Sequence, residues 1–223
     1  MSKIISLKKL LLAAAGIIVM LAACRKDDYY VDGGLSHQSR EEQNMPVYDF
    51  LASRSNHMFD SLIKIIDLTG TKSLVNQAGI TFFAVPNPGV MRLQMNYNPD
   101  DRQALRPLAS IGKDTLVKLL NRFIITGAKI SLETALNDKV RYYKDLNGDS
   151  LMISGKGGGV NAGSSVQTSA FYLEYVHVKI PGTDTIRFTG NMQTHNLITA
   201  NAIVHVLNNS SSFAAGFKLK YFR

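Results

Sequence analysis

The sequence contains a single cysteine and no tryptophan, and each shortage excludes a type of protein. One cysteine cannot build a disulfide framework or a thiolate zinc site, so the folded part must depend on a hydrophobic core. The absence of tryptophan weakens the case for a surface that stacks sugar rings. The formal net charge is +8, but the basic residues are scattered along the chain, which argues against a surface that binds nucleic acid.

Patterns that mark common catalytic and metal sites are also missing. The chain has no GxSxG nucleophile elbow, and its five histidines show neither HxxxH nor HxH spacing. Its 17 acidic residues are sparse, and no context marks two of them as a catalytic carboxylate pair. We therefore predict a protein that is not an enzyme and that binds no metal or cofactor. A hydrolase is the less favoured alternative, because it needs a histidine, an acid and a nucleophile to converge.

The apolar run near the start of the chain is too short to cross a membrane. It extends over twelve residues, 10–21, whereas a helix needs about 20 residues to span ~30 Å of hydrocarbon. Lys3, Lys8 and Lys9 precede the run, and small residues follow it. A basic start, a short apolar middle and small residues at the boundary are typical of a cleaved secretory signal, which we place at residues 1–23.

The lone cysteine comes directly after this signal. The segment Leu21–Cys24, LAAC, resembles the lipobox of bacterial lipoproteins, in which the cysteine thiol is acylated and becomes the first residue of the mature chain. An ordinary signal peptide followed by an incidental cysteine is the alternative. Two or three acyl chains on Cys24, palmitate among them, would anchor the protein stably, because each buried methylene contributes about 0.8 kcal/mol.

The charged residues after the cysteine resemble an export tag, in which a basic or polar residue precedes two acids, here Lys26, Asp27 and Asp28. In one glycan-foraging Gram-negative phylum, such a tag carries lipoproteins to the outer face of the outer membrane. We therefore expect a lipid-anchored outer-membrane protein that is exposed at the cell surface. A solvated linker is the alternative. The polar residues that follow predict a flexible tether, so residues 24–44 are assigned to a lipidated tether.

Helix signals dominate the next part of the chain. Pro46 fits the first turn of a helix, Asn56 and Asp114 are expected to cap two further helices, and Gly70 is expected to end one. Between these helices, the β-branched and aromatic residues Thr81–Val85 predict a buried strand.

The later part reads as strands. Residues 140–145 and 150–154 flank the turn signal LNGD and predict a β-hairpin. Residues 166–180 contain a long alternating stretch, and residues 198–208 predict a second hydrophobic strand. Helices first and strands afterwards indicate an α+β fold rather than a βαβ repeat.

Two segments resemble the signature boxes of the fasciclin domain. Residues 79–90, GITFFAVPNPGV, keep most of the first box, and residues 201–208, NAIVHVLN, keep the asparagine and the isoleucine-histidine-valine strand of the second. The matching box residues are Phe83, Ala84, Pro86, Asn87, Asn201 and His205. Val85 is inserted before the proline of the first box, and Ala202 replaces the glycine of the second. A tyrosine-histidine pair of the family is also missing near Arg122 and Phe123.

The resemblance implies a fold and a class of function. It predicts a compact β-wedge or sandwich packed with several helices in the N-terminal half, covering residues 45–210, with residues 211–223 as a C-terminal tail. Fasciclin domains serve mostly in cell-surface adhesion and are not generally enzymatic. The family boxes are expected to be structural.

Two features admit a functional interpretation beside a structural one. His205 can be read as a metal ligand or a base, but a hydrogen-bonded histidine at the edge of the core is favoured, because a buried ring nitrogen needs a partner. Residues 145–150, DLNGDS, begin like a calcium loop. However, Ser150 and Lys156 stand where an EF-hand loop needs glycine and glutamate, so a turn is favoured.

Three segments are candidates for surface contacts. Tyr142 and Tyr143 fall on opposite faces of a strand, so at most one of them is exposed. The alternating tail at residues 217–223, FKLKYFR, predicts an edge strand, with a basic-aromatic patch as the alternative. A lysine followed by glycines lacks the order of a phosphate-binding loop and predicts a contact loop at Lys156, Gly157, Gly158 and Gly159.

Together these features predict a surface-anchored fasciclin-like lipoprotein that mediates adhesion or binds a macromolecule. Its expected partners are the membrane, through the N-terminal lipid, and an extracellular protein or polysaccharide. A glycan-binding accessory of an outer-membrane nutrient-uptake complex is the alternative.

Overall fold

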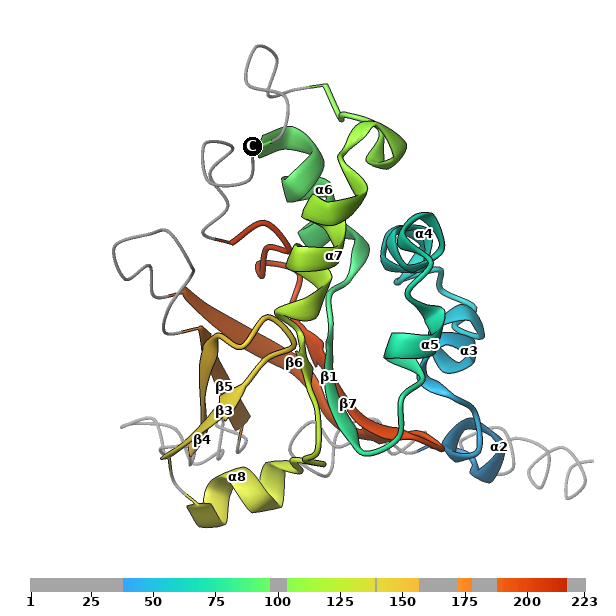
Figure 1. The fold of residues 1–223 in the computed structure, drawn as a ribbon. Helices are drawn as coiled ribbons and strands as arrows, with labels where there is room; N and C mark the ends of the chain where they lie inside the picture. The colour runs from blue at the N-terminus through green and yellow to red at the C-terminus, as the bar shows by residue number, and fades with distance from the viewer. Residues whose placement is uncertain (1–37, 97–103, 139, 157–171, 178–187, 216–223) are drawn as a thin grey trace, which may run out of the picture. The chain divides into compact units, whose positions relative to one another are not determined.

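The computed structural model describes residues 38–96, 104–138, 140–156, 172–177 and 188–215 (Figure 1). The chain divides into two units, Met1–Val31 and Asp32–Arg223, and every described residue belongs to the second. The predicted signal peptide, Cys24 and the export tag at Lys26, Asp27 and Asp28 therefore lie outside the described residues.

The described strands form one seven-stranded sheet in the order β2-β1-β7-β6-β5-β4-β3. Strands β1 and β7 run parallel, and the other neighbouring pairs are antiparallel. The strands are β1 Ile80–Ala84, β2 Ile124–Ile125, β3 Val140–Lys144, β4 Ser150–Lys156, β5 Tyr172–His177, β6 Phe188–Ile198 and β7 Ala202–Leu207.

The two ends of this sheet approach each other. Ile125 in β2 forms an isolated antiparallel bridge with Asp145, the residue directly after β3. The register of β6 against β7 shifts twice, between Met192 and Thr194 and between Thr194 and Leu197. Such irregularities increase the local twist of a strand, which allows a sheet to curl.

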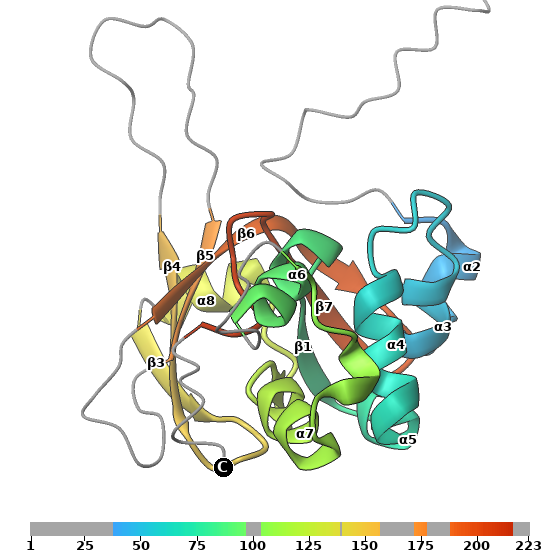
Figure 2. The same cartoon turned by 90° about the horizontal axis from the view of Figure 1, so that it is seen from above.

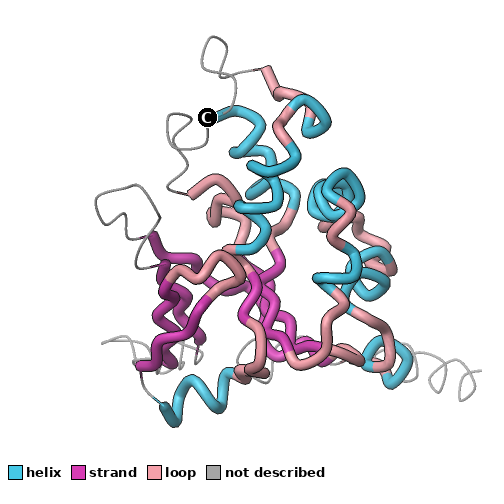
Figure 3. The backbone as a smooth tube through the Cα atoms, viewed as in Figure 1, coloured by secondary structure: helices cyan, strands magenta, loops and turns pink. Residues whose placement is uncertain are grey.

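Helices α3, α4 and α5 lie together on one side of the strands β1 and β7 in both views (Figures 1 and 2). Figure 3 shows α8 apart from the other helices, and it packs against β4. The helices are α2 Arg40–Gln43, α3 Val47–Ala52, α4 Asp60–Thr69, α5 Lys72–Val75, α6 Asn87–Asn96, α7 Lys113–Asn121 and α8 Leu132–Asp138, with a 3-10 turn at Leu108–Ser110.

The hydrophobic core is formed between β1, β7 and the helices. All five residues of β1 are buried, as the run of β-branched and aromatic residues predicts. Phe82 and Phe83 are fully buried, and α4 and α7 contribute Ile65, Ile66 and Leu119. Full burial of a large apolar side chain contributes about 1.5–3 kcal/mol. The mixture of helices and sheet confirms the predicted α+β class.

The structure also confirms several local predictions. Gly70 ends α4 with a left-handed φ of 69°, which glycine adopts without strain. Strands β3 and β4 pair as the predicted hairpin around the LNGD turn. Tyr142 is 63% exposed, whereas Tyr143 is partly buried against the core.

Two predicted helix starts are wrong. The Asn56 side chain accepts a hydrogen bond from the Met58 N–H and forms a turn, and α4 begins only at Asp60. Asp114 lies inside the first turn of α7, whose N-cap is Gly112. An acidic side chain in this place favours a helix through its dipole as well as through capping, so the two roles give the same sequence signal.

Three predicted boundaries also differ from the structure. Arg40–Gln43, at the end of the predicted tether, forms α2, because Ser39 and Glu42 make a capping box. Residues 198–208 are not one strand, since β6 ends at Ile198 and β7 begins at Ala202. The core extends past residue 210, where Phe213 is fully buried and stacks on Phe123 at 5.2 Å between ring centroids.

Candidate functional site

The two predicted signature boxes lie beside each other. Strand β1 carries the first box and β7 the second, and the parallel register places Phe83 opposite His205. Their rings stack with centroids 5.6 Å apart and an interplanar angle of 24°. The boxes therefore form one continuous piece of the core.

His205 is fully buried, and both of its ring nitrogens contact the backbone. Nδ1 accepts a hydrogen bond from the Asn196 N–H at 3.4 Å, so the ring proton is placed on Nε2, which donates to the Ile130 carbonyl at 2.8 Å. Burial lowers the pKa of His205 to about 4, and the nearby His195 adds to this effect, while the Ile130 carbonyl opposes it. The imidazole is therefore neutral at neutral pH. Its two hydrogen bonds agree with the structural interpretation of His205 that the sequence favours over a metal ligand or a base.

A second histidine lies next to it. The rings of His195 and His205 meet edge to face, with centroids 6.0 Å apart. Burial also lowers the pKa of His195 to about 4. Among the described residues, no group of three or more histidine, cysteine, aspartate or glutamate side chains is placed to hold a metal ion. Sequence reasoning missed this pair, because its contact depends on the register shifts in β6.

Polar side chains around the histidines, the buried Thr81 and the half-buried Asn196, hold the segment that leads into α8. Thr81 Oγ donates to the Ala128 carbonyl at 2.7 Å and accepts from the Ile130 N–H at 2.8 Å. Asn196 Oδ1 accepts from the Leu132 N–H at 2.8 Å and so satisfies a backbone donor at the start of α8. His205, Thr81 and Asn196 thus fix the approach to this helix.

Asn201 of the second box stabilises the start of α3. Its Oδ1 accepts a hydrogen bond from the Val47 N–H at 2.9 Å. Its Nδ2 donates to the carbonyls of Val75 at 3.2 Å and Gln77 at 2.9 Å. Pro46, the N-cap residue of α3, provides no side-chain cap, so Asn201 supplies that function from a distant part of the chain.

Asn87 of the first box does the same for α4. Its Oδ1 accepts from the Ser61 N–H at 2.9 Å, and its Nδ2 donates to the His57 carbonyl at 2.8 Å. The N-cap of α4 is Phe59, which has no capping side chain. The remaining box residues also serve the fold: Ala84 is buried, and the Pro86 carbonyl accepts a hydrogen bond from the Gly89 N–H.

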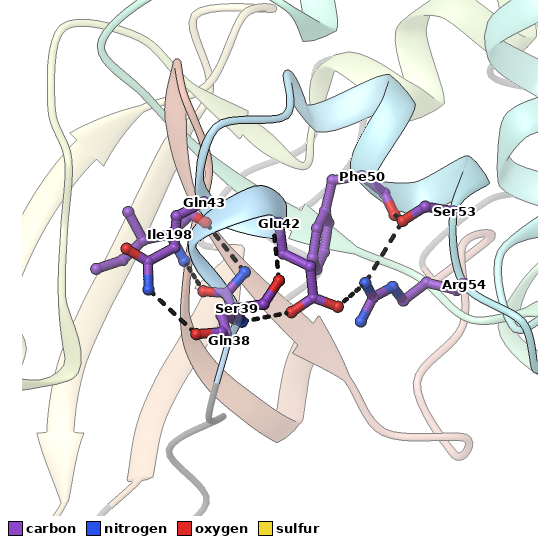
Figure 4. A network of polar contacts seen from close by, with 8 residues as sticks. All are labelled: Gln38, Ser39, Glu42, Gln43, Phe50, Ser53, Arg54 and Ile198. Atoms are coloured by element: carbon purple, nitrogen blue, oxygen red, sulfur yellow. Dashed lines mark hydrogen bonds and ion pairs between the residues drawn. The ribbon is translucent and has the colours of Figure 1, made fainter.

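A polar network fastens the first described residues to the domain (Figure 4). The Gln38 side chain exchanges two hydrogen bonds with the backbone of Ile198, donating to its carbonyl and accepting from its N–H. Glu42 forms an ion pair with Arg54, whose guanidinium lies 4.4 Å from the centre of the Phe50 ring. Burial acts to raise the pKa of Glu42, but bonds from Arg54 and the Ser39 N–H, with the charge of Arg54, lower it overall.

Asp145, one of the oxygen-bearing residues that suggested a calcium loop, forms hydrogen bonds within the hairpin turn. Asp145 Oδ1 accepts hydrogen bonds from the Asn147 N–H at 2.8 Å and the Asp149 N–H at 2.9 Å. Gly148 has a φ of 83°, a conformation that suits glycine in a turn. The Asp145 carboxylate therefore stabilises the turn, whereas the Asn147 side chain bonds to Asn121 and to the Lys118 carbonyl. The predicted contact loop begins at Lys156, the last residue of β4, and Gly157, Gly158 and Gly159 lie outside the described residues.

Strand β3 is far more exposed than β1, β2 and β7. Four of its five residues are exposed, including Val140 at 51% and Tyr142 at 63%. Arg141 forms an ion pair with Asp138 at 3.2 Å, and Lys144 Nζ donates to Ser150 Oγ at 2.9 Å. The alternation of the strand places the exposed Tyr142 on the same face as Lys144, and Arg141 on the other face beside Tyr143.

Comparisons with known proteins find likenesses in structure but none in sequence. No family model matches the chain, and no curated protein matches it. The structure is similar to that of a FAS1 domain pair from the insect cell adhesion molecule fasciclin I, with a TM-score of 0.49 and 16% sequence identity. The match covers 73% of this chain and 49% of the other, so the chain spans about half the length of that structure. No described helix is both long and apolar enough to cross a membrane.

Proposed function

We propose that this protein is a lipid-anchored binding module, displayed at the cell surface, whose fasciclin-like domain mediates adhesion or holds a macromolecule. One observation carries the binding role. The described residues of the predicted boxes are engaged in holding the fold, whereas β3 presents Tyr142, Arg141 and Lys144 to solvent. The LAAC segment and the charged residues after it support the anchor and its export.

The contacts of His205 argue against a catalytic role for this residue. A general base needs a free lone pair within reach of the substrate. In His205, one ring nitrogen accepts a hydrogen bond from a backbone N–H, and the other donates one to a backbone carbonyl. The residue is also fully buried, so a substrate cannot reach it. We therefore propose a positioning role for His205 in the fold and no catalytic role.

Presentation at a distance from the membrane is the proposed mechanism. Acylation would fix Cys24, and Gln38 is fastened to the end of β6. Fourteen steps of the chain separate these residues, and a fully extended segment of that length reaches about 45 Å. The domain would therefore reach partners well beyond the lipid headgroups.

The anchor is tested with Cys24→Ser in the full chain, expressed in a Gram-negative host. The wild-type protein is expected to incorporate labelled palmitate, to sediment with membranes and to be removed from intact cells by external protease. The variant is expected to lose the label and the membrane association. A variant that still pellets with membranes would overturn the anchor, and protection of the wild type from external protease would overturn surface display.

A glycan-binding accessory role is the second candidate, and the exposure of Tyr142 favours it, because a flat aromatic face can stack on a sugar ring. A glycan array probed with the wild type and with Tyr142→Ala separates the two candidates. A glycan signal that Tyr142→Ala abolishes would support this second role. Tyr143→Phe, at a partly buried position, is the matched control.

A further inference from the structure

We propose that the outer edge of β3 is a docking site for an extended, acidic segment of a partner protein, which pairs with β3 as an additional strand. This proposal rests on the proposed binding function and names the class of partner. Strand addition provides main-chain hydrogen bonds for affinity, and alternate side chains provide selectivity.

The position of β3 supplies the first argument. It is the last strand in the sheet order, and all five of its residues pair with β4, from Val140 opposite Ser154 to Lys144 opposite Ser150. On the other side, the described part of the chain provides a partner only past the end of the strand, where Ile125 meets Asp145. An edge strand of this kind directs backbone N–H and C=O groups outward, where another strand can pair with them.

The side chains supply the second argument. Val140, Tyr142 and Lys144 alternate along β3 and therefore share one face. The exposed fractions of Val140 and Tyr142, 51% and 63%, leave a β-branched and an aromatic side chain available for cross-strand contacts. Such residues are the ones that cross-strand pairs in sheets favour.

The charge of the edge selects the partner. Asp138 neutralises part of the charge of Arg141, whose guanidinium lies 5.5 Å from the centre of the Tyr143 ring. The ammonium group of Lys144 contacts only a neutral hydroxyl, that of Ser150, in the described hydrogen bonds. Lys144 therefore offers an incoming carboxylate a cation that has no acidic partner among the described ion pairs. Without the predicted signal and its three lysines, the formal net charge of the chain falls from +8 to +5 and stays positive.

A second copy of this chain suits the edge less well. Antiparallel pairing of two β3 strands would bring both copies of Arg141 and Lys144 into one short interface between two positively charged molecules. Cationic residues on an edge are a common means of preventing such self-pairing. Five residues per strand also provide much less contact than the ~1,600 Å² of a typical stable interface.

The test measures binding of a fluorescent peptide of alternating glutamate and valine to the full chain in detergent, by anisotropy, with a glutamate-to-lysine version as the control peptide. We expect the acidic peptide to bind and the basic peptide not to bind. The double variant Arg141→Glu with Lys144→Glu should weaken the acidic peptide at least tenfold and admit the basic one. Lys64→Glu, at an exposed position on α4, is the matched control and should change affinity less than twofold.

Each other outcome overturns the proposal. Equal binding of both peptides, or insensitivity to the charge reversal, would show that the edge does not select acidic strands. A dimer in sedimentation experiments that the reversal dissociates would assign the edge to a second copy. If the peptide binds only after deletion of residues 216–223, the occupant of the β3 edge is this segment of the chain itself and not a partner protein. Hydrogen exchange checks the location, because peptide should protect the amides of β3. Peptide binding does not depend on lipidation. A negative peptide result would therefore leave the proposed anchor intact, and the loss of the anchor would leave the proposed docking site intact.

Discussion

The parallel pair β1–β7 and the hairpin β3–β4 belong to one sheet, yet they differ in where their polar side chains lie. Those of β1 and β7 are buried, and those of β3 are mostly exposed. In β1 and β7, Thr81 and His205 are fully buried, and their side chains are hydrogen-bonded to the backbone. Strand β3 is the last in the sheet order, and four of its five residues are exposed. The first pair uses its polar groups to specify the fold, whereas the second holds the exposed residues on which the proposed docking depends.

This difference separates what a motif says about structure from what it says about function. Asn87, Asn201 and His205 are the residues on which the family resemblance depends, and each one holds a helix start or its approach. They explain why the chain folds as it does. The exposed residues of β3 carry no family signature, so a ligand must be sought there by experiment and not by motif.

Asn201→Ala should break the first region most severely. It leaves the buried Val47 N–H and the buried Val75 carbonyl without their partner, and it also removes a bond to the carbonyl of the exposed Gln77. An unsatisfied buried group costs about 1–3 kcal/mol, so we expect a loss of about 4 kcal/mol in the free energy of unfolding, measured with urea. Asn209→Ala, at an exposed position, should change it by less than ~0.5 kcal/mol. Equal losses in both variants would contradict the capping role.

Acid should weaken the same region through the histidines. Burial lowers the pKa of His195 and His205 from 6.5 to about 4, so the unfolded chain binds protons more readily than the folded one. Their contribution is complete above pH 6.5 and is lost as the pH falls toward 4, by up to about 3 kcal/mol for each histidine. Unfolding curves between pH 7 and pH 4 measure this slope.

Histidine variants assign the pH dependence. His205→Gln should be less stable at pH 7 but should lose less stability on acidification. His57→Asn is the control, because the His57 side chain is 79% exposed, and this variant should keep the full slope. An unchanged slope in His205→Gln would show that other groups cause the acid sensitivity.

The sequence predicted those elements whose cause is local. Strand β1 follows from its run of β-branched and aromatic residues, and the β3–β4 hairpin follows from its turn residues. The end of α4 follows from Gly70. The start of α3 was predicted from Pro46, but its capping side chain was not, because Asn201 lies far from it in the chain. The start of α4 could not be predicted in the same way, because its capping side chain is supplied by the distant Asn87.

The arrangement of the candidate site was even less accessible to sequence reasoning. The contact of His195 with His205 requires the two register shifts in β6 and a left-handed Asn196, with a φ of 55°. The docking of α2 depends on Gln38 meeting Ile198, which is 160 residues away. No local pattern encodes these pairings, since they follow from the packed structure.

Gly155→Ala sharpens the comparison inside the hairpin, because β4 is its buried strand. A Cβ atom at this position would lie 2.4 Å from the Leu136 Cα, so α8 would have to move away from the sheet. Overpacking of this kind costs about 1–3 kcal/mol, and we expect a corresponding fall in the thermal midpoint by circular dichroism. Ser150→Ala, at the other end of β4, should have a smaller effect. A neutral Gly155→Ala would show that α8 is free to shift.

Tyr142→Ser should have the smallest effect on folding and the clearest effect on binding. The side chain is 63% exposed, so the free energy of unfolding should change by less than ~0.5 kcal/mol, whereas removal of an aromatic cross-strand contact should weaken the acidic peptide severalfold. Tyr143→Ser, on the opposite face of the same strand, should show the reverse, because Tyr143 packs against the core. The contrast between the two adjacent tyrosines would disappear if the exposed face of β3 did not contact the partner.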